Sequence, residues 1–284
     1  MIYIIIPVHN RKYYTQGCLD CLEQQTYRDF TTIVVDDGST DGTVAMIDTY
    51  FPDVIVLRGD GNLWWTKAIN MGVQYALDCT ANSAADVVLT LNDDLAFGPN
   101  YLASIMASYE ANKPCLIGSA VVDITNPDYL EYAGVSCNYF TAKWIRTSTI
   151  FKSSYQQLAA KHAIVPTDDL PGRGTIIPLN VFEAVGLYDE QNFPHYMADV
   201  ELSVRARRKG YRLFVSVGSV IHNYTDATRN KKQSWQSFLK GFFSFKSPNY
   251  LRSRYAFAVR HAPLKQLYFL LDLGRMTTGF LLNR

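Results

Sequence analysis

Two apolar segments of this chain each end on a pair of aspartates. Residues 32–41 read Thr-Ile-Val-Val-Asp-Asp-Gly-Ser-Thr-Asp, and residues 89–94 read Leu-Thr-Leu-Asn-Asp-Asp. Adjacent carboxylates repel each other unless a cation, or hydrogen bonds to the ionised form, stabilises them. In an open α/β sheet the strand ends line the crevice in which ligands bind. The two pairs therefore predict a site that handles a divalent metal ion and a nucleotide.

Apolar runs alternate with helical stretches through the first part of the chain. The expected strands are 2–7, 31–36, 54–58, 86–91 and 115–122, and the expected helices are 12–25, 41–50, 64–79 and 99–111. A further helix is expected at 196–209, ended by Gly210, with a strand at 211–217 after it. This alternation is typical of βαβ units, so we expect an α/β fold with a mostly parallel sheet.

Length and composition fit one large domain, or one domain with an appendage. The chain has 284 residues, of which 48% are hydrophobic, and its first residues are typical of a strand rather than a signal peptide. No apolar run reaches the 18 residues of a membrane-spanning helix. Five cysteines without a secretion signal favour reduced thiols in a cytoplasmic protein. We expect the lone CxxC at Cys18 and Cys21 to pack on the first helix, since no second cysteine pair or nearby histidine completes a zinc or redox site.

Charge is divided unevenly along the chain. Residues 229–284 carry 11 Lys or Arg and one acid, Asp272, which gives +10, whereas the remainder carries 16 basic and 25 acidic residues, which gives −9. A basic tail on an acidic body predicts an anionic partner for the tail: a membrane surface, a nucleic acid or a lipid-linked phosphate.

The tail also carries two apolar helical faces. The first consists of Trp235, Phe238, Leu239, Phe242 and Phe243, with Ser234 as the expected N-cap, and the second of Leu264, Leu267, Tyr268 and Leu271. Lys231, Lys232, Lys240 and Lys246 flank the first face. Such faces either pack on the body or on a second subunit, or they lie in the headgroup region of an anionic membrane. The excess of positive charge favours the membrane, and we do not expect nucleic acid as a partner.

Five motifs follow one another along the chain. They are Ile-Ile-Pro-Val-His-Asn (5–10), Val-Val-Asp-Asp-Gly-Ser-Thr-Asp-Gly-Thr (34–43), Asn-Leu-Trp-Trp-Thr-Lys-Ala-Ile-Asn-Met-Gly (62–72), Leu-Asn-Asp-Asp (91–94) and Tyr-Met-Ala-Asp-Val-Glu-Leu-Ser-Val-Arg-Ala-Arg-Arg-Lys-Gly-Tyr (196–211). This series resembles the family 2 glycosyltransferases, inverting enzymes with the nucleotide-sugar-binding GT-A fold. Asn-Leu-Trp-Trp, the Asn-x-Asp form at 92–94 and the Gly-Arg-Gly-Thr-Ile-Ile-Pro stretch resemble bacterial rhamnosyltransferase-like members that build surface polysaccharides. The resemblance implies a GT-A domain at 1–225 and a basic, aromatic helical extension at 226–284.

The resemblance places the nucleotide of the sugar donor at the ends of the first two strands. The nucleobase would lie against Pro7, Val8, His9 and Asn10. His9 stands where the family often has Tyr, and it either stacks on the base or is a buried structural histidine. Of Asp36 and Asp37, one would accept a hydrogen bond from the N3–H of uracil or thymine, and the other would cap the turn that follows.

The resemblance also suggests how the diphosphate and the metal ion are held. Lys67 would contact the diphosphate or occupy a solvated helix position, and Trp64 before it stands where relatives often carry Gly. Asn92, Asp93 and Asp94 take the place of the family's DxD motif. Mg²⁺ and Mn²⁺ prefer carboxylate and phosphate oxygens, so Asp94 would be the first metal ligand and Asp93 would bind the ribose or the sugar. His222 would complete the metal shell or have a structural role.

Asp199 aligns with the family's general base, within a Glu-Asp-x-Asp pattern that reads Ala-Asp-Val-Glu here. Ala198 lacks the first acid, and Glu201 replaces the second and could pair with Arg205 four residues later. A base is needed because a sugar hydroxyl is a poor nucleophile until a carboxylate removes its proton. Glu201 and Gly174 would lie on the acceptor side.

The resemblance therefore implies a metal-dependent inverting glycosyltransferase. A UDP- or dTDP-linked sugar would be the donor, and a glycan or a polyprenyl-linked glycan would be the acceptor, at the inner face of the plasma membrane. Two alternatives stay open. A sugar nucleotidyltransferase would open with a Gly-rich basic loop that residues 7–10 do not provide, and a catalytically inactive glycan-binding relative would fit the altered motif at 198–201.

Overall fold

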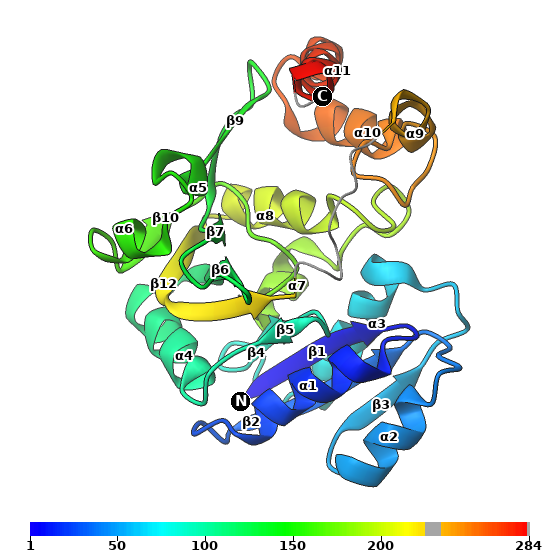
Figure 1. Ribbon diagram of the computed structural model, residues 1–284, viewed down its shortest axis with the longest axis vertical. Coiled ribbons are helices and arrows are strands. Elements are labelled where there is room, and N and C mark those ends of the chain that lie inside the picture. Colours follow the sequence, from blue (N-terminus) through cyan, green and yellow to red (C-terminus); the bar gives the residue numbers. More distant parts are fainter. Residues whose placement is uncertain (225–233, 283–284) are drawn as a thin grey trace.

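The computed structural model describes residues 1–224 and 234–282, and it has a mixed central sheet with helices on both faces (Figure 1). The strand order is β10-β12-β6-β11-β4-β1-β2-β3. From β12 to β3, every strand except β11 points the same way, because β11 is antiparallel to both β4 and β6. The α/β fold with a mostly parallel sheet is therefore confirmed.

The N-terminal part consists of regular βαβ units. Its elements are β1 (Ile2–Val8), α1 (Lys12–Glu23), β2 (Phe30–Asp36), α2 (Thr43–Tyr50), β3 (Ile55–Arg58), α3 (Trp64–Cys79) and β4 (Val87–Thr90). These bounds agree with the expected strands and helices to within a few residues. β1 pairs in parallel with β2 on one side and β4 on the other, so the three strands end at the same edge of the sheet.

The second part adds antiparallel strands and short helices. Its elements are β5 (Leu95–Ala96), α4 (Tyr101–Asn112), β6 (Cys115–Asp123), β7 (Leu130–Tyr132), β8 (Val135–Asn138), β9 (Lys143–Arg146), α5 (Thr147–Ile150), α6 (Tyr155–Ala159), β10 (Ile164–Pro166), β11 (Thr175–Pro178), α7 (Leu179–Val185), α8 (Ala198–Arg208) and β12 (Arg212–Asn223). β12 is longer than the expected strand at 211–217. Its register on β6 shifts between Ser216 and Val220, and pairing then resumes to Asn223.

Two apolar layers enclose the sheet because side chains of its strands alternate between the faces. Ile4 and Ile6 of β1 pack with residues of α1, α2 and α4, such as Leu19, whereas Ile5 packs with residues of α3, such as Ile69. Each of these side chains is fully or almost fully buried. Burying one contributes about 1.5–3 kcal/mol. The free cysteines Cys18 and Cys21 lie on α1, as expected for packing residues.

The C-terminal segment forms α9 (Trp235–Gly241), α10 (Leu251–His261) and α11 (Lys265–Leu282), which lie together at one end of the molecule (Figure 1). Ser234 caps α9 by accepting a hydrogen bond from the N–H of Ser237, as expected. Phe257 of α10 is buried in the same apolar layer as α8, and α9 stacks Phe238 on Phe280 of α11. Lys231 and Lys232 lie outside the described residues. None of the helices described is long and apolar enough to cross a membrane.

Candidate active site

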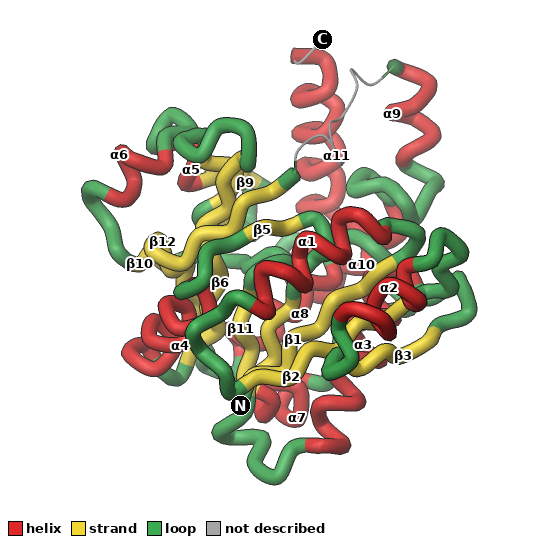
Figure 2. Tube along the Cα trace, turned by 60° about the horizontal axis from the view of Figure 1, so that its bottom comes forward, coloured by secondary structure: helices red, strands yellow, loops and turns green. Residues whose placement is uncertain are grey.

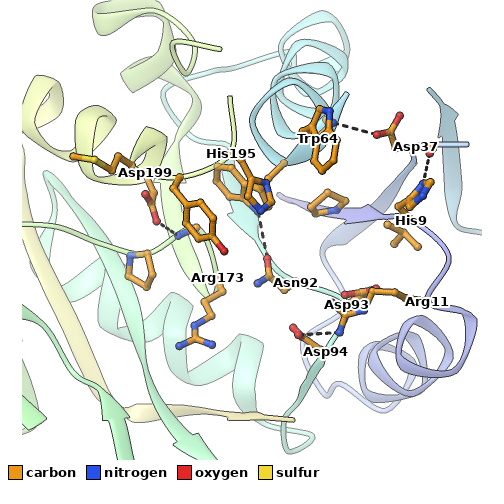
Figure 3. A pocket seen from close by; sticks show the side chains of 18 of the residues that line it. His9, Arg11, Asp37, Trp64, Asn92, Asp93, Asp94, Arg173, His195 and Asp199 are labelled. Atoms are coloured by element: carbon orange, nitrogen blue, oxygen red, sulfur yellow. Dashed lines mark hydrogen bonds and ion pairs between the residues drawn. The ribbon is translucent and has the colours of Figure 1, made fainter. Parts of the chain in front are cut away.

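A cavity of about 530 Å³ opens at the edge of the sheet where β1, β2 and β4 end. Figure 3 shows the carboxylates of Asp93 and Asp94 on one side of it and Asp199 on the other. Asp37 and Trp64 form a third part of the wall. The cavity thus lies where ligands bind in open α/β sheets, and it brings together acids from three separate parts of the chain.

Asp93 and Asp94 are both buried, and the guanidinium of Arg11 lies against them. Arg11 Nη2 donates to Asp94 Oδ2 at 2.9 Å, and Arg11 Nε lies 3.3 Å from Asp93 Oδ2. Burial raises the pKa of Asp93 to about 7, although the charge of Arg11 acts to lower it. One guanidinium therefore faces two buried carboxylates.

The donor set at this position fits a divalent cation whose shell is completed by a substrate. Asp93 Oδ2 and Asp94 Oδ1 are buried and accept no hydrogen bond from the part of the chain that the structure describes, and oxygen is the ligand atom that Mg²⁺ and Mn²⁺ prefer. Among the described residues, no three or more His, Cys, Asp or Glu side chains converge as a complete metal site. Mg²⁺ is commonly held by one or two carboxylates together with substrate phosphates, which is the arrangement that these residues allow.

Asp37 holds the loop that forms the third part of the wall. Its Oδ1 accepts from the N–H of Gly61, and its Oδ2 accepts from those of Leu63 and Trp64. Trp64 has a φ of 58°, a left-handed conformation that glycine adopts more easily. The backbone at Trp64 therefore has a conformation that is typical of glycine, and the hydrogen bonds from the loop to Asp37 help to stabilise it.

The ring of Trp64 is covered by residues of the C-terminal segment. Lys246 Nζ lies 4.2 Å from the ring centroid, and Phe245 meets the ring edge-on at 5.0 Å. His195 contacts the same ring, and burial, with the charge of Lys246, lowers the pKa of His195. The segment after α9 is thus part of the cavity's surroundings.

His9 is exposed and lines the cavity, so it is not a buried histidine. Its Nδ1 donates to the carbonyl oxygen of Asp37, since a carbonyl can only accept, and its Nε2 accepts from the side-chain amide of Asn10. Asn10 in turn accepts from the N–H of Thr40. These contacts fix the ring at the end of β1, next to Pro7 and Val8, which also line the cavity.

Asp199 lies in the first turn of α8, and its carboxylate lines the cavity. Oδ2 accepts from the N–H of Gly172 at 3.0 Å, and Oδ1 accepts from that of Val200 at 2.9 Å. Burial raises the pKa of Asp199 above its ordinary value, although these two hydrogen bonds act to lower it. An ionised acid with a raised pKa is suited to accept a proton.

Several residues expected at the site do not line the cavity. Lys67 is exposed on α3, which corresponds to a solvated helix position, and Asp36 is buried behind Asp37. Gly174 has a φ of 69° and is buried, since an added Cβ would lie 2.9 Å from Ser119 Oγ. Gly172, rather than Gly174, reaches the cavity.

Glu201 and His222 also lie away from the cavity lining. Glu201 accepts from Arg205, as expected, but its other oxygen is 3.0 Å from His261 Nε2 of α10. Burial acts to raise the pKa of Glu201, but the hydrogen bonds from His261 and Arg205 hold it below its ordinary value. Glu201 is therefore buried and paired outside the cavity lining, and its acceptor-side role stays a prediction. His222 lies on β12, paired opposite Ala96.

The structure adds cavity residues to which the motifs assigned no role. Arg11 directly follows the first motif, which ends at Asn10. This position was the one feature of the sequence that could have indicated a role for Arg11 at the cavity. Trp65 donates from Nε1 to Asn92 Oδ1 at 3.3 Å, and Gly172 leaves room for its ring, because a Cβ there would lie 2.0 Å from Trp65 Cζ2. Arg173 also lines the cavity and pairs with Glu131.

A mostly parallel sheet with a carboxylate pair at one strand end and an acid at the start of a later helix defines a glycosyltransferase of the GT-A class. Residues 3–163 match the profile described as Glycosyl transferase family 2, which covers more than half of the chain. The chain belongs to this family.

Relatives of known name agree with this assignment. The N-acetylglucosaminyl-diphospho-decaprenol L-rhamnosyltransferase of Mycobacterium tuberculosis is 25% identical over 225 residues, which are 74% of this chain and 72% of that protein. The teichoic acid poly(glycerol phosphate) polymerase of Staphylococcus epidermidis is 27% identical over 57% of this chain, but over only 22% of its own length.

Solved structures show the same fold. GalNAc-T7, crystallised with UDP, GalNAc and Mn²⁺, superposes with a TM-score of 0.63 and 16% identity over 98% of this chain. This chain spans about half of that one, at 54%. S. aureus TarS 1–349 superposes with a TM-score of 0.60 and 13% identity, over 98% of this chain and 72% of that one.

Proposed function

We propose that this family 2 glycosyltransferase is a metal-dependent, inverting enzyme that moves a sugar from a nucleotide-diphospho-sugar to a glycan acceptor. The observation that carries the proposal is the single cavity that has the buried Asp93–Asp94 pair on one side and Asp199 on the other. The first side suits a cation and a diphosphate, and the second suits the deprotonation of a hydroxyl. A sugar that spans the cavity would meet both.

The nucleobase of a UDP- or dTDP-linked sugar would bind at the ends of β1 and β2. Asp37 and His9 lie there, held by the contacts described above. Each carboxylate oxygen has two lone pairs, and Asp37 Oδ1 accepts only from Gly61, so it can still accept from a pyrimidine N3–H. The GT-A relatives in complex with UDP support a uridine nucleotide.

Asp94, with Asp93, would hold Mg²⁺ or Mn²⁺, which neutralises charge on the leaving diphosphate. The Mn²⁺ found with GalNAc-T7 supports this choice of metal. His222 would join this shell only if β12 or its neighbours moved, because it does not line the cavity. We therefore place the cation on the two carboxylates and on the oxygens of the sugar donor.

Asp199 would remove the proton from the attacking hydroxyl of the acceptor. Its hydrogen bonds to Gly172 and Val200 fix the carboxylate, so it can accept a proton without reorganising. The hydroxyl would then attack the anomeric carbon from the face opposite the diphosphate, and the configuration would invert. Trp65, His195 and Tyr196 line the space between the two sides and would exclude water from it.

The acceptor would be a polyprenyl-linked glycan of cell-surface polysaccharide synthesis, and the sugar would be a rhamnose or another hexose. The mycobacterial relative, whose name describes rhamnosyl transfer to a decaprenol-linked sugar, supports this choice. The basic C-terminal segment with its exposed apolar side chains would hold the enzyme at the inner face of the plasma membrane, close to such an acceptor.

A thermal-shift screen of nucleotide-sugars with Mn²⁺, followed by product analysis, tests the proposal. A ligand at 100 times its Kd stabilises the native state by about 2.7 kcal/mol, so a true sugar donor should raise the melting temperature. Asp94→Ala or EDTA should abolish the shift and the transfer, whereas Lys67→Ala, outside the cavity, should change neither. Undiminished transfer in EDTA, or a product with retained configuration, would reject the mechanism. Binding of glycans without any transfer would favour the inactive glycan-binding alternative.

A further inference from the structure

Arg11 lies against the two carboxylates to which the proposed function assigns the cation. Its guanidinium contacts Asp94 Oδ2 at 2.9 Å and approaches Asp93 Oδ2 at 3.3 Å. The two acids are 4–5% exposed, whereas the side chain of Arg11 is 32% exposed. Figure 3 shows the side chain of Arg11 beside Asp93 and Asp94, and its larger exposure means that part of it faces solvent and has room to move away.

The contact leaves the carboxylates only partly compensated. One guanidinium faces two buried carboxyl groups, and none of the described residues donates a hydrogen bond to Asp93 Oδ2 or Asp94 Oδ1. A buried carboxylate oxygen without a hydrogen bond is costly, so the site retains an attraction for a further cation. Arg11 and a divalent cation would nevertheless compete, because both require the same oxygens and like charges repel at short range.

The guanidinium already has a contact besides those to the carboxylates. Arg11 lies over the ring of Tyr14, with its Cζ 4.9 Å from the ring centroid, and an arginine on an aromatic face is held by a cation–π contact. Arg11 also lines the cavity, where its planar fork can bind phosphate oxygens in a bidentate manner. The guanidinium can thus leave the carboxylates without losing all of its partners.

We propose that Arg11 is a placeholder for the divalent cation, which stabilises Asp93 and Asp94 in the free enzyme and transfers to the diphosphate when the sugar donor and the cation bind. This inference rests on the proposed function. The described residues provide no complete metal shell. A cation that binds without the sugar donor must therefore displace Arg11 and gains only two carboxylates and water as ligands. With the sugar donor present, phosphate oxygens complete the shell and also receive Arg11. Cation and nucleotide binding are therefore positively coupled.

The coupling can be measured without any turnover. The free Mn²⁺ signal in electron paramagnetic resonance gives the Mn²⁺ affinity, first with Mn²⁺ alone and then with saturating UDP. Wild type should bind Mn²⁺ weakly alone and more tightly with UDP. Arg11→Gln should bind Mn²⁺ alone more tightly than wild type, by about 5–150-fold, the usual range of coupling between two ligands. The gain in Mn²⁺ affinity from UDP should shrink in the same variant.

Two further variants keep the result interpretable. Lys12→Gln removes the same charge from the next residue, which is exposed and does not line the cavity, and it should behave as wild type. Arg11→Lys keeps a charge that can pair with the acids but lacks the bidentate fork, so it should fold even if Arg11→Gln does not, and its Mn²⁺ affinity should lie between the other two.

The possible failures are distinguishable. If wild type binds Mn²⁺ and UDP together but Arg11→Gln and Arg11→Lys bind Mn²⁺ alone no more tightly than wild type, the placeholder role is rejected and the proposed function stands. If wild type binds neither Mn²⁺ nor UDP, in any combination, both proposals fail. Equal gains in Lys12→Gln and Arg11→Gln would also reject the placeholder role, because net charge alone would then explain the effect.

Discussion

Asp199 is the residue on which the chemistry of the proposed transfer depends. Asp199→Asn keeps an oxygen that can accept from Gly172 or Val200, so the loop and α8 should stay in place. Turnover should fall by about 10²–10⁴-fold, the usual contribution of a positioned general base, while nucleotide-sugar affinity should be unchanged. Steady-state kinetics with a donor-binding assay measure both. Near-wild-type turnover would move the role of base to another acid.

The raised pKa of Asp199 predicts a dependence of activity on pH. The base must be ionised, so kcat/KM should be high at alkaline pH and fall as the pH drops through a pKa above the ordinary 3.8. Asp169 is a second candidate for the group whose protonation lowers kcat/KM on the acidic side of the profile. Burial, with the charge of Asp199, raises the pKa of Asp169 to about 7. A pH–rate profile of Asp169→Asn separates the two. If the acidic limb disappears in that variant, it belongs to Asp169.

At the scale of single residues, the sequence predicted the positions of the acids better than the positions of the side chains around them. Asp37, Asp94 and Asp199 stand at the end of a strand or the start of a helix, where the chain direction alone places them at the sheet edge. Arg11 and Trp65 depend on the direction of a long side chain, which no periodicity specifies. Glu201 lies outside the cavity lining because it is two residues after Asp199, and residues two apart on a helix do not face the same side.

At the scale of elements, Glu201 joins α8 to α10 through His261, and its other oxygen pairs with Arg205 of the same helix. Glu201 and His261 are buried, at 2% and 8% exposed, whereas Arg205 is partly exposed. Glu201→Gln should lower the free energy of unfolding by about 1.5–3 kcal/mol, the range for hydrogen bonds to a charged group. Chemical denaturation at neutral pH measures this loss. Glu183→Gln, an exposed acid on α7, is the matched control and should have no effect.

The Glu201–His261 pair also predicts how the loss of stability in Glu201→Gln varies with pH. The pKa of Glu201 is lower in the folded protein than its ordinary value of 4.5. Its contribution is therefore fully present above pH 4.5 and is lost as the pH falls through the folded-state pKa. The difference in melting temperature between wild type and Glu201→Gln should shrink below pH 4.5. A constant difference down to acid pH would mean that packing, rather than charge, holds α10.

Strand β12 shows where the prediction of elements fails. The apolar run after Gly210 indicated a strand to 217, and the shift between Ser216 and Val220 hid its continuation to Asn223. A bulge adds residues on one strand, and a slip of one residue moves every later side chain to the opposite face. The side on which His222 lies was therefore not predictable from its position after the strand.

At the scale of the whole molecule, the C-terminal segment packs on the body with one side and is exposed on the other. α10 is packed on the body through Phe257 and His261, and Lys246 lies over Trp64 at the cavity. The remaining side of the segment is apolar and exposed. Its exposed side chains are Trp235, Leu239 and Phe243 in and after α9, and Leu267, Leu270, Leu271, Leu281 and Leu282 in α11. α9 and α11 project together from one end of the molecule (Figure 2).

This exposed side predicts attachment to anionic membrane without a spanning helix. Each Lys or Arg near such a surface contributes about 1 kcal/mol, and salt weakens the attraction. Binding to vesicles that contain phosphatidylserine or phosphatidylglycerol should therefore decrease as ionic strength rises, and Lys240→Glu with Leu267→Ser and Leu270→Ser should release the protein. Lys246 is left unchanged because its charge lies at the cavity, so nucleotide binding should persist in this variant. Lys161→Glu, an exposed reversal on the body, is the control for net charge. If wild type ignores anionic vesicles at low salt and sediments as a dimer that the same three substitutions dissociate, the apolar side is a subunit interface instead.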